Sequence, residues 1–175
     1  MASSTTTKNL RDGSMQVWDG TGTPLKITLD LLEGNLTFTE TTNTVNVLDR
    51  GSLDHQRTGD EAAVTGSFTA KYTEFISDSG DGPLLYEVLT DTGEAASDNW
   101  ISTSATATDV WTLTVYFSIL DPDTADSTRY ENVKFSKFSP TSIEFSEGDE
   151  FNTIAVNFQA FEIRPTITKT AAAPA

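Results

Sequence analysis

The residues of this chain best suited to chemistry gather around its single histidine. His55 directly follows Asp54, and any of many serines could complete a Ser-His-Asp arrangement in which the histidine accepts a proton from a serine hydroxyl. No Gly-x-Ser-x-Gly turn, which would hold such a serine on a strained bend, accompanies them. The absence of cysteine excludes thiol catalysis, disulfides and zinc–thiolate sites. The sequence therefore favours a protein that is not an enzyme.

Two other patterns could hold an ion. Asp121, Asp123 and Asp126 offer the hard oxygen ligands that Ca²⁺ prefers, but their spacing lacks the glycine and the closing glutamate of an EF-hand loop. The segment 20–22, Gly-Thr-Gly, resembles part of a phosphate loop, but no P-loop lysine follows it. We therefore expect no catalytic residue, metal or cofactor, and calcium at the three aspartates is the alternative.

Charge and length limit the possible functions further. The chain has 175 residues, which fits one domain with a real core. Its 26 acidic and 11 basic residues give a net charge of -15, which repels nucleic-acid phosphates and argues against a sequence-reading DNA binder. No run approaches the roughly 20 apolar residues of a membrane span, and no secretory signal is visible. We expect a protein made in the cytosol and without a membrane partner.

The elements that would position these residues are mainly strands. Apolar and polar residues alternate most regularly over 111–119, and the same period-2 pattern predicts strands at 35–41, 63–75 and 130–138. Residues 15–18 and 25–32 predict an opening hairpin, and residues 143–145 and 154–163 a closing one. In the closing strand the apolar phase changes after Phe158, which predicts a β-bulge near Ala160.

One short helix is expected over 83–90. Pro83 suits the first helical position, an apolar pair repeats four residues later, and Gly93 provides a stop. Many short strands and a single helix predict a mainly β fold, an antiparallel β-sandwich or barrel flanked by one short α-helix. We expect a flexible segment at 1–10, a single domain at 11–167 and a flexible tail at 168–175.

A long polar segment, 40–62, separates two of the predicted strands. Loops of this length inside a compact domain are usually functional or disordered. Its charges of both signs suit docking onto another subunit, and a solvated mobile loop is the alternative. The residues that we expect at such a contact are Asp49, Arg50, Asp54, His55, Arg57 and Asp60.

Four predicted strands present a face rich in threonine, serine and asparagine. Such side chains hold water but do not form the strong contacts with which Lys and Arg bind phosphate. In an acidic protein they suit the wall of a channel through which nucleic acid slides, although ordinary solvent exposure would produce the same composition. The residues expected on this face are Thr37, Thr39, Thr65, Ser67, Thr69, Thr112, Thr114, Ser118, Asn132 and Ser136.

The order and spacing of several segments resemble the tail tube proteins of long-tailed bacteriophages, the major tail protein family. The likeness spans most of the chain. The segments that carry it are DGSMQV (12–17), DGTGTP (19–24), EGNLTFTE (33–40), GSFT (66–69), FSEGD (145–149) and IAVNFQA (154–160).

This resemblance implies a structural virion protein. Six copies would close into a ring, rings would stack into the tail tube, and one sheet of each subunit would join a continuous barrel around the lumen. The polar strands would line that lumen, and the long segment would reach a neighbouring subunit or ring. The tube would conduct viral DNA during ejection without binding it specifically. Its implied partners are tape measure, tail terminator and sheath proteins, and its implied location is the virion tail after assembly in the host cytoplasm.

Two alternatives remain at this point. The tube of a contractile secretion system shares the expected fold but passes protein effectors. A ligand-binding β-sandwich, for carbohydrate, would use Trp18, Trp100 or Trp111 as stacking platforms. Because Trp111 is in phase with core residues, only clustering of Trp18 and Trp100 on an exposed concave face would favour such a module.

Overall fold

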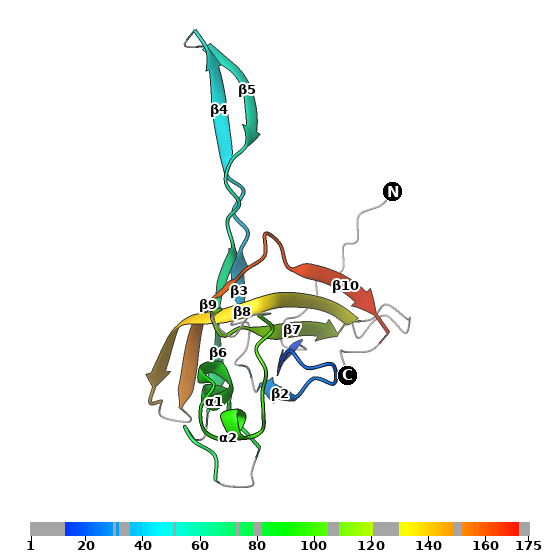
Figure 1. The fold of residues 1–175 in the computed structure, drawn as a ribbon, viewed down its shortest axis with the longest axis vertical. Coiled ribbons are helices and arrows are strands. Elements are labelled where there is room, and N and C mark those ends of the chain that lie inside the picture. The colour runs from blue at the N-terminus through cyan, green and yellow to red at the C-terminus, as the bar shows by residue number, and fades with distance from the viewer. Residues whose placement is uncertain are drawn as a thin grey trace.

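The structure is a computed structural model that describes residues 13–29, 31, 36–50, 52–72, 74–78, 82–104, 109–120, 130–148 and 152–171. It is mainly β, as the alternation of residues predicts (Figure 1). The elements are β1 (Gly13–Trp18), β2 (Lys26–Leu29), β3 (Thr37–Thr39), β4 (Thr44–Asp49), β5 (Ser52–Thr58), β6 (Val64–Lys71), α1 (Leu85–Thr90), α2 (Gly93–Ser97), β7 (Leu113–Leu120), β8 (Tyr130–Ser146), β9 (Thr153–Ala160) and β10 (Thr166–Thr170).

Eight strands form one antiparallel sheet. Seven follow the order β2-β1-β7-β8-β9-β6-β3, and β10 pairs with β8. The opening hairpin pairs Met15 with Leu29, and the closing hairpin pairs Ile143 with Val156, so both predicted hairpins are confirmed. The remaining strands, β4 and β5, pair with each other in a separate two-stranded sheet.

The 17-residue strand β8 divides the large sheet into two halves. Its first part pairs with β7 on one edge and with β10 on the other, whereas its second part pairs with β9. Lys137 adopts a left-handed φ of 52°, and the β8–β9 register shifts between Pro140 and Ser142, close to the change of partners. We name the halves the β1 half (β2, β1, β7, the first part of β8 and β10) and the β6 half (the second part of β8, β9, β6 and β3).

The two halves share one apolar core. The rings of Phe68 and Phe138 lie 6.3 Å apart, and those of Phe135 and Phe158 lie 5.3 Å apart, centroid to centroid. An isolated bridge between Leu31 and Ala70 also links the chain after β2 to β6. The sheet thus folds back onto itself as a sandwich that approaches a barrel, which confirms the predicted fold class.

The structure corrects three expectations about the elements. The segment 40–62 is not a loop, because most of it forms the β4–β5 hairpin. Residues 168–170 belong to β10, since their β-branched threonines complete a strand on the edge of β8, while residues 1–10 and 172–175 lie outside the described residues. The phase change near Ala160 marks the end of β9 rather than a bulge, and Phe161 and Ile163 lie exposed in the connection to β10.

The helical region also differs from the prediction. The expected helix is present as α1, but a second helix, α2, begins at Gly93, where the sequence predicted only a stop. Asp91 ends α1 in the left-handed region, with φ 54°, and Gly93 adopts φ 56°. Gly93 leaves no room for a Cβ, because that atom would collide with the carboxylate of Glu87.

Glu87 ties these helices together from a buried position. Its carboxylate accepts hydrogen bonds from the Leu84 amide (2.9 Å), the Glu94 amide (3.1 Å) and the Ser77 hydroxyl (2.8 Å). Burial by itself would raise the pKa of Glu87, but these hydrogen bonds outweigh it and hold the pKa below its usual value of 4.5. The ionised carboxylate therefore stabilises the fold.

We predict that Glu87→Ala destabilises the subunit by about 3 kcal/mol at neutral pH, because three donors lose a charged acceptor inside the protein. A folded-state pKa below the unfolded value means that this stabilisation is present above pH 4.5 and is lost as the pH falls through the folded pKa. Denaturant unfolding at several pH values measures both effects. Glu74→Ala, an exposed neighbour, is the control, and equal stability of the two variants would contradict this role of Glu87.

Candidate assembly surfaces

The residues first considered for chemistry lie in open solvent. His55 and Asp54 form a 2.6 Å hydrogen bond, with side chains 59% and 57% exposed, so they lack the enclosed surroundings of a catalytic pair. Among the described residues, no group of three or more His, Cys, Asp or Glu side chains could hold a metal ion. Asp121, Asp123 and Asp126 lie outside that part of the chain. The described helices are all too short or too polar to span a membrane.

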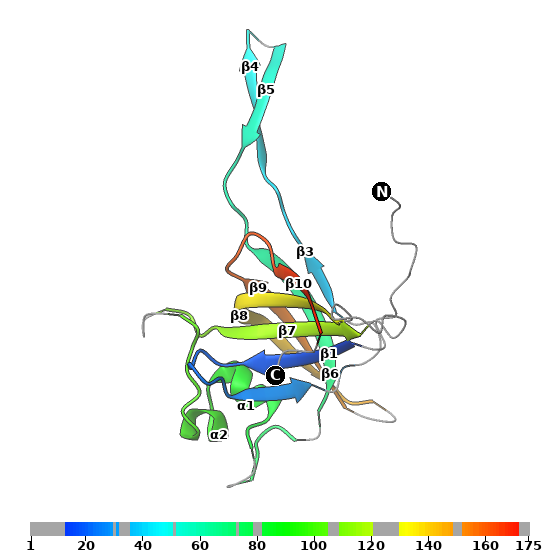
Figure 2. The same cartoon turned by 90° about the vertical axis from the view of Figure 1, so that its right-hand side faces the viewer.

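The β4–β5 hairpin stands away from the rest of the protein (Figures 1 and 2), and we name residues 44–58 the projecting hairpin. It contains five of the six residues expected at a subunit contact: Asp49, Arg50, Asp54, His55 and Arg57. Asp60 lies at its base, where its carbonyl accepts a hydrogen bond from Asn43. Arg50 lies in the turn at the far end, with a left-handed φ of 50°.

Apolar side chains on the projecting hairpin are a stronger sign of a contact than its charges. Leu48 and Leu53 are cross-strand partners near the turn and are 61% and 60% exposed, and Val45 is also exposed. A lone two-stranded hairpin is marginally stable in water, and an exposed apolar pair makes the isolated hairpin still less favourable. Sequence reasoning missed this pair because it interpreted 40–62 as a loop, in which no strand register would place the leucines opposite each other.

Five of the expected lumen residues lie together on the outer side of the β6 half. Thr37 and Thr39 of β3 are the cross-strand partners of Ser67 and Thr65 of β6, and Thr69 follows on the same side. The structure adds Ser142, Asn157 and Gln159 from β8 and β9. We name these eight residues the polar face.

Hydrogen bonds link the polar face across its strands. The hydroxyls of Thr37 and Ser67 lie 3.0 Å apart, and the Asn157 amide donates to the Ser142 hydroxyl over 2.7 Å. Because Ser67 is also the partner of Asn157 in the sheet register, these four side chains form one row across β3, β6, β9 and β8. The result is a continuous surface of hydroxyl and amide groups.

The other five expected lumen residues lie elsewhere. Thr114, Ser118, Asn132 and Ser136 belong to the β1 half, and Thr112 lies just before β7. Both halves turn their apolar sides to one core, so their outer sides face away from each other, and the ten residues cannot line a single bore.

For three of these five, the expected exposure is wrong, since Thr112, Ser118 and Asn132 are buried. Thr112 packs into a hydroxyl cluster, 2.8 Å from Thr103 and 2.9 Å from Ser104. Asn132 donates a 2.7 Å hydrogen bond to Thr170 of β10. The unpredicted strand β10 therefore explains the burial of Asn132.

The outer side of the β1 half has a different character from the polar face. The rings of Trp18 and Tyr116 pack against each other at an angle of 48°, with their centroids 4.6 Å apart. The ammonium of Lys26 lies 5.7 Å from the Trp18 ring, and that of Lys134 lies 5.5 Å from the Tyr116 ring. Trp100 is buried, so it shares no exposed platform with Trp18, and the condition for a carbohydrate-binding module is not met.

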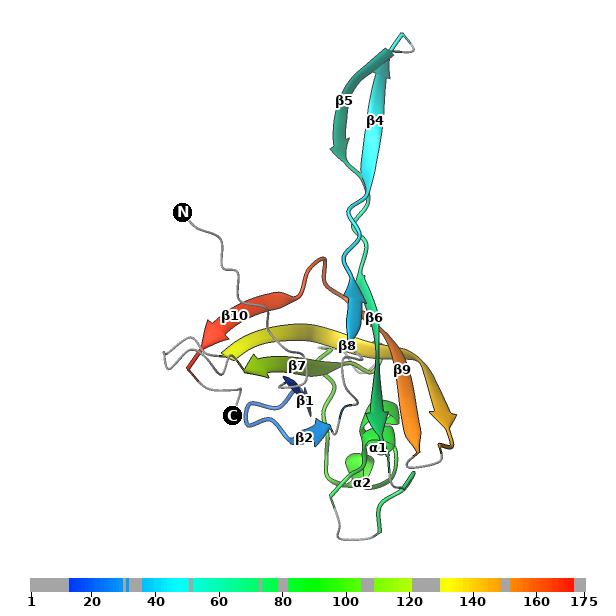
Figure 3. The same cartoon turned by 180° about the vertical axis from the view of Figure 1, so that it is seen from behind.

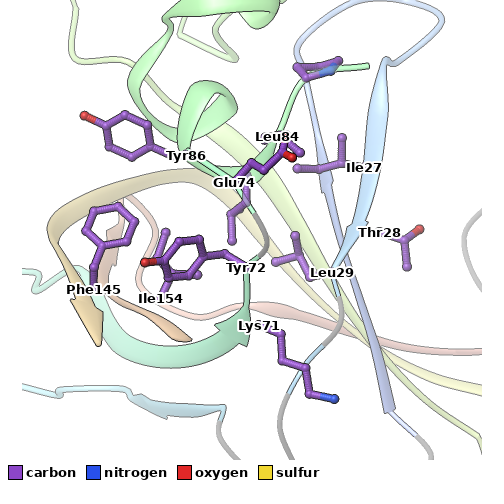
Figure 4. Close-up of a pocket in the computed structure, with 12 residues that line it drawn as sticks. Ile27, Thr28, Leu29, Lys71, Tyr72, Glu74, Leu84, Tyr86, Phe145 and Ile154 are labelled. Atoms are coloured by element: carbon purple, nitrogen blue, oxygen red, sulfur yellow. The ribbon is translucent and has the colours of Figure 1, made fainter. Parts of the chain in front are cut away.

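A pocket of about 450 Å³ opens beside α1, where β2, β6, β8 and β9 approach the helix (Figure 4). The ring of Phe145 lies 5.3 Å from Tyr72, 5.6 Å from Tyr86 and 4.6 Å from Phe75, and Phe75 and Phe145 are exposed. We name this site the aromatic pocket. The residues that line it are Ile27, Thr28, Leu29, Lys71, Tyr72, Glu74, Pro83, Leu84, Leu85, Tyr86, Phe145 and Ile154.

Sequence reasoning did not find the aromatic pocket. Tyr72 and Phe145 were expected in apolar rows of two strands, and nothing local indicated that both would meet Tyr86 of α1. The rings come from segments far apart in the chain, which only the tertiary fold brings together.

No protein-family model matches this chain, and no curated protein does. Solved structures, however, match it. The sheath/tube terminator of an extracellular contractile injection system, PVC, has a TM-score of 0.56 at 12% identity, covering 89% of this chain and 92% of its own. The tube-terminating cap of the anti-feeding prophage has a TM-score of 0.51 at 10% identity, covering 89% and 88%. The SPP1 tail tube has a TM-score of 0.49 at 12% identity, covering 92% and 79%.

The two neighbours with TM-scores above 0.5 are a sheath/tube terminator and a tube-terminating cap, so the resemblance inferred from the sequence is confirmed at the level of fold. Identities of 10–12% indicate a shared fold and leave function to the surfaces described above.

We predict that replacing both Leu48 and Leu53 with serine leaves the isolated subunit as stable as the wild type, within about 0.5 kcal/mol, because the two side chains make few contacts within one copy. Thermal unfolding at low protein concentration measures the effect. Leu113→Ser provides the contrast, since Leu113 is fully buried and its loss should cost about 3 kcal/mol. A large destabilisation by the double variant would show that the hairpin leucines serve the fold itself.

Proposed function

We propose that this protein is a structural subunit of the tube of a phage tail or of a related contractile injection system, and that it is not an enzyme. The observation that carries this proposal is the exposed Leu48–Leu53 pair on a projecting hairpin, a surface that association with another copy would cover. Support comes from the fold, which the chain shares with a tube terminator and a tube-terminating cap.

In this proposal, copies assemble side by side into hexameric rings, and the rings stack. Ring closure satisfies strand edges that would otherwise be open to random pairing, which is the general advantage of closed barrels. The β-sandwich domain, with β10 included, forms the ring, and the projecting hairpin reaches a neighbouring copy through its charged and apolar residues. Tape measure, terminator and sheath proteins are the expected further partners, in a particle assembled in the host cytoplasm.

The polar face of the β6 half is the proposed wall of the lumen. Its members are hydroxyl and amide side chains, with one lysine, Lys71, at the end of the same row of β6, whereas the outer side of the β1 half presents two lysines, Lys26 and Lys134, over aromatic rings. Lysine side chains bind phosphate, so a bore lined by the β1 half would retain DNA more strongly. A hydroxyl-lined bore in a protein of net charge -15 lets DNA pass without specific binding.

A second candidate is a terminator, a ring that ends a tube rather than extending it. The comparisons favour it specifically, because the two neighbours with TM-scores above 0.5 are a terminator and a cap. The first of them comes from an extracellular contractile injection system, and in a tube of that kind the cargo would be a protein effector rather than viral DNA. A terminator would form a ring through the same lateral contacts but would stack on one side only.

Negative-stain microscopy of the purified protein over a range of concentration and salt distinguishes these candidates. We expect rings that stack into tubes. The two surfaces that meet in a stacking contact differ from each other, so every added ring leaves one surface free for the next ring. Rings that never stack would favour the terminator. A protein that remains monomeric under every condition would contradict both candidates.

The lumen assignment makes a further prediction for assembled particles. Ser67→Lys adds a cation to every copy on the polar face and should slow DNA release at least several-fold, through new phosphate contacts. Thr114→Lys is the matched control, because Thr114 lies on the β1 half and its new charge would stay outside the bore. DNA release from purified particles, followed by dye fluorescence, is the measurement. A slower release with Thr114→Lys alone would reverse the assignment of the two faces.

A further inference from the structure

We propose that the aromatic pocket of one copy receives the tip of the projecting hairpin from the next copy. This inference rests on the proposed function in that the partner is a second copy of the chain. It adds an acceptor site, which the resemblance to tail tube proteins did not supply, and it assigns the two ends of the molecule complementary roles.

The tip of the hairpin has the form of an insertion element. Leu48 and Leu53 face each other across the strands next to the turn, so they form one apolar unit. Arg50 lies in the turn beyond them, and charged residues of β5 follow on the other side. An apolar centre with a charged rim is the usual arrangement of a protein interface.

The aromatic pocket has matching properties. Figure 4 shows Tyr72, Phe145 and Tyr86 gathered on one side of the pocket, with Ile154 next to Tyr72 and with Leu29 and Ile27 on the other side. Aromatic and aliphatic walls of this kind hold the anchor residues that contribute most of the binding energy at interfaces. A volume of about 450 Å³ lies within the range of preformed binding pockets.

One wall of the pocket is held in place by the buried carboxylate of Glu87. Phe75 lies against Phe145, and two residues further on, Ser77 donates its hydrogen bond to Glu87 of α1. The segment that carries Phe75 is therefore fastened to the helix before any partner arrives. A preformed pocket reduces the entropy cost of binding.

The positions of the two sites require a second copy. Figures 1 and 3 both show the projecting hairpin at one end of the molecule and α1 at the other. A hairpin cannot reach the pocket of its own chain, but it can reach that of a copy placed above or below. Because donor and acceptor are different surfaces, the contact leaves one of each free and continues along a stack.

Charges at the two sites are complementary. Glu74 lines the pocket, and Arg50 lies in the turn at the tip of the hairpin. Their opposite charges favour one orientation of the hairpin over its reverse. The tip therefore has an apolar anchor for affinity and a charged rim for register.

The absence of cysteine allows a direct test by cross-linking. Two single variants, Leu53→Cys and Glu74→Cys, are mixed in equal amounts under conditions in which the wild type assembles, and a short bis-maleimide reagent is added. One variant carries an affinity tag, so the mixed product has its own size on a gel. The control pair is Leu53→Cys with Ile167→Cys, an exposed residue of β10, and circular dichroism checks that every variant is folded.

We expect about tenfold more mixed product from the 53/74 pair than from the control pair, because docking raises the effective concentration of the two thiols. Equal yields from both pairs would overturn the inference, as would a poor yield from the 53/74 pair in particles that still stack. Such results would leave the proposed function standing. A wild type that stays monomeric would instead contradict the proposed function, and the inference with it.

Discussion

Strand β8 pairs with β7 and β10 along its first part and with β9 along its second, and the rest of the structure depends on this change of partners. Because one strand belongs to both halves of the sheet, the halves fold over a common core in which Phe135 and Phe138 of β8 meet Phe158 and Phe68. The bend thus produces two outer surfaces that face away from each other, one of hydroxyl and amide groups and one of lysines over aromatic rings. Two different outer faces suit the proposed role, in which one face lines a lumen and the other faces outward.

The apolar core of the chain is closed, whereas each of its two ends leaves apolar side chains exposed. At one end, the projecting hairpin exposes a leucine pair in a sheet of only two strands. At the other, rings from β6, β8 and α1 surround an open pocket rather than closing over it. Each of these features is unfavourable in an isolated monomer, and association through both removes the two costs together.

Local patterns in the sequence were sufficient for much of the fold. The alternation along 111–119 and 154–160 predicted β7 and β9, and the turn residues predicted both flanking hairpins. The sequence patterns did not predict those elements whose formation depends on another strand or side chain. Residues 166–170 form a strand because an edge of β8 is open to them, and α2 follows α1 because the carboxylate of Glu87 accepts the amide of Glu94. The β8 edge is distant in sequence from residues 166–170, and although Glu87 lies only seven residues before Glu94, composition does not show that its side chain turns back to that amide.

The candidate surfaces were also predicted only in part. Thr37, Thr65 and Ser67 share one polar face in the structure, because the period of a strand determines which residues share a side, and their place in a lumen remains a prediction. That period does not reveal how strands are ordered, so Thr114 and Ser136 of the other half were assigned to the same surface. The aromatic pocket was missed because its rings become neighbours only through the fold.

A cryo-EM reconstruction of the assembled particle tests the central claim most directly. The account predicts that the polar face of the β6 half lines the bore, with Ser67 and Asn157 facing the axis and the Lys26–Trp18 side facing outward. It also predicts density for the Leu48–Leu53 tip inside the aromatic pocket of the adjacent ring. A bore lined by Lys26 and Lys134, with hairpins pointing freely into solvent, would contradict it.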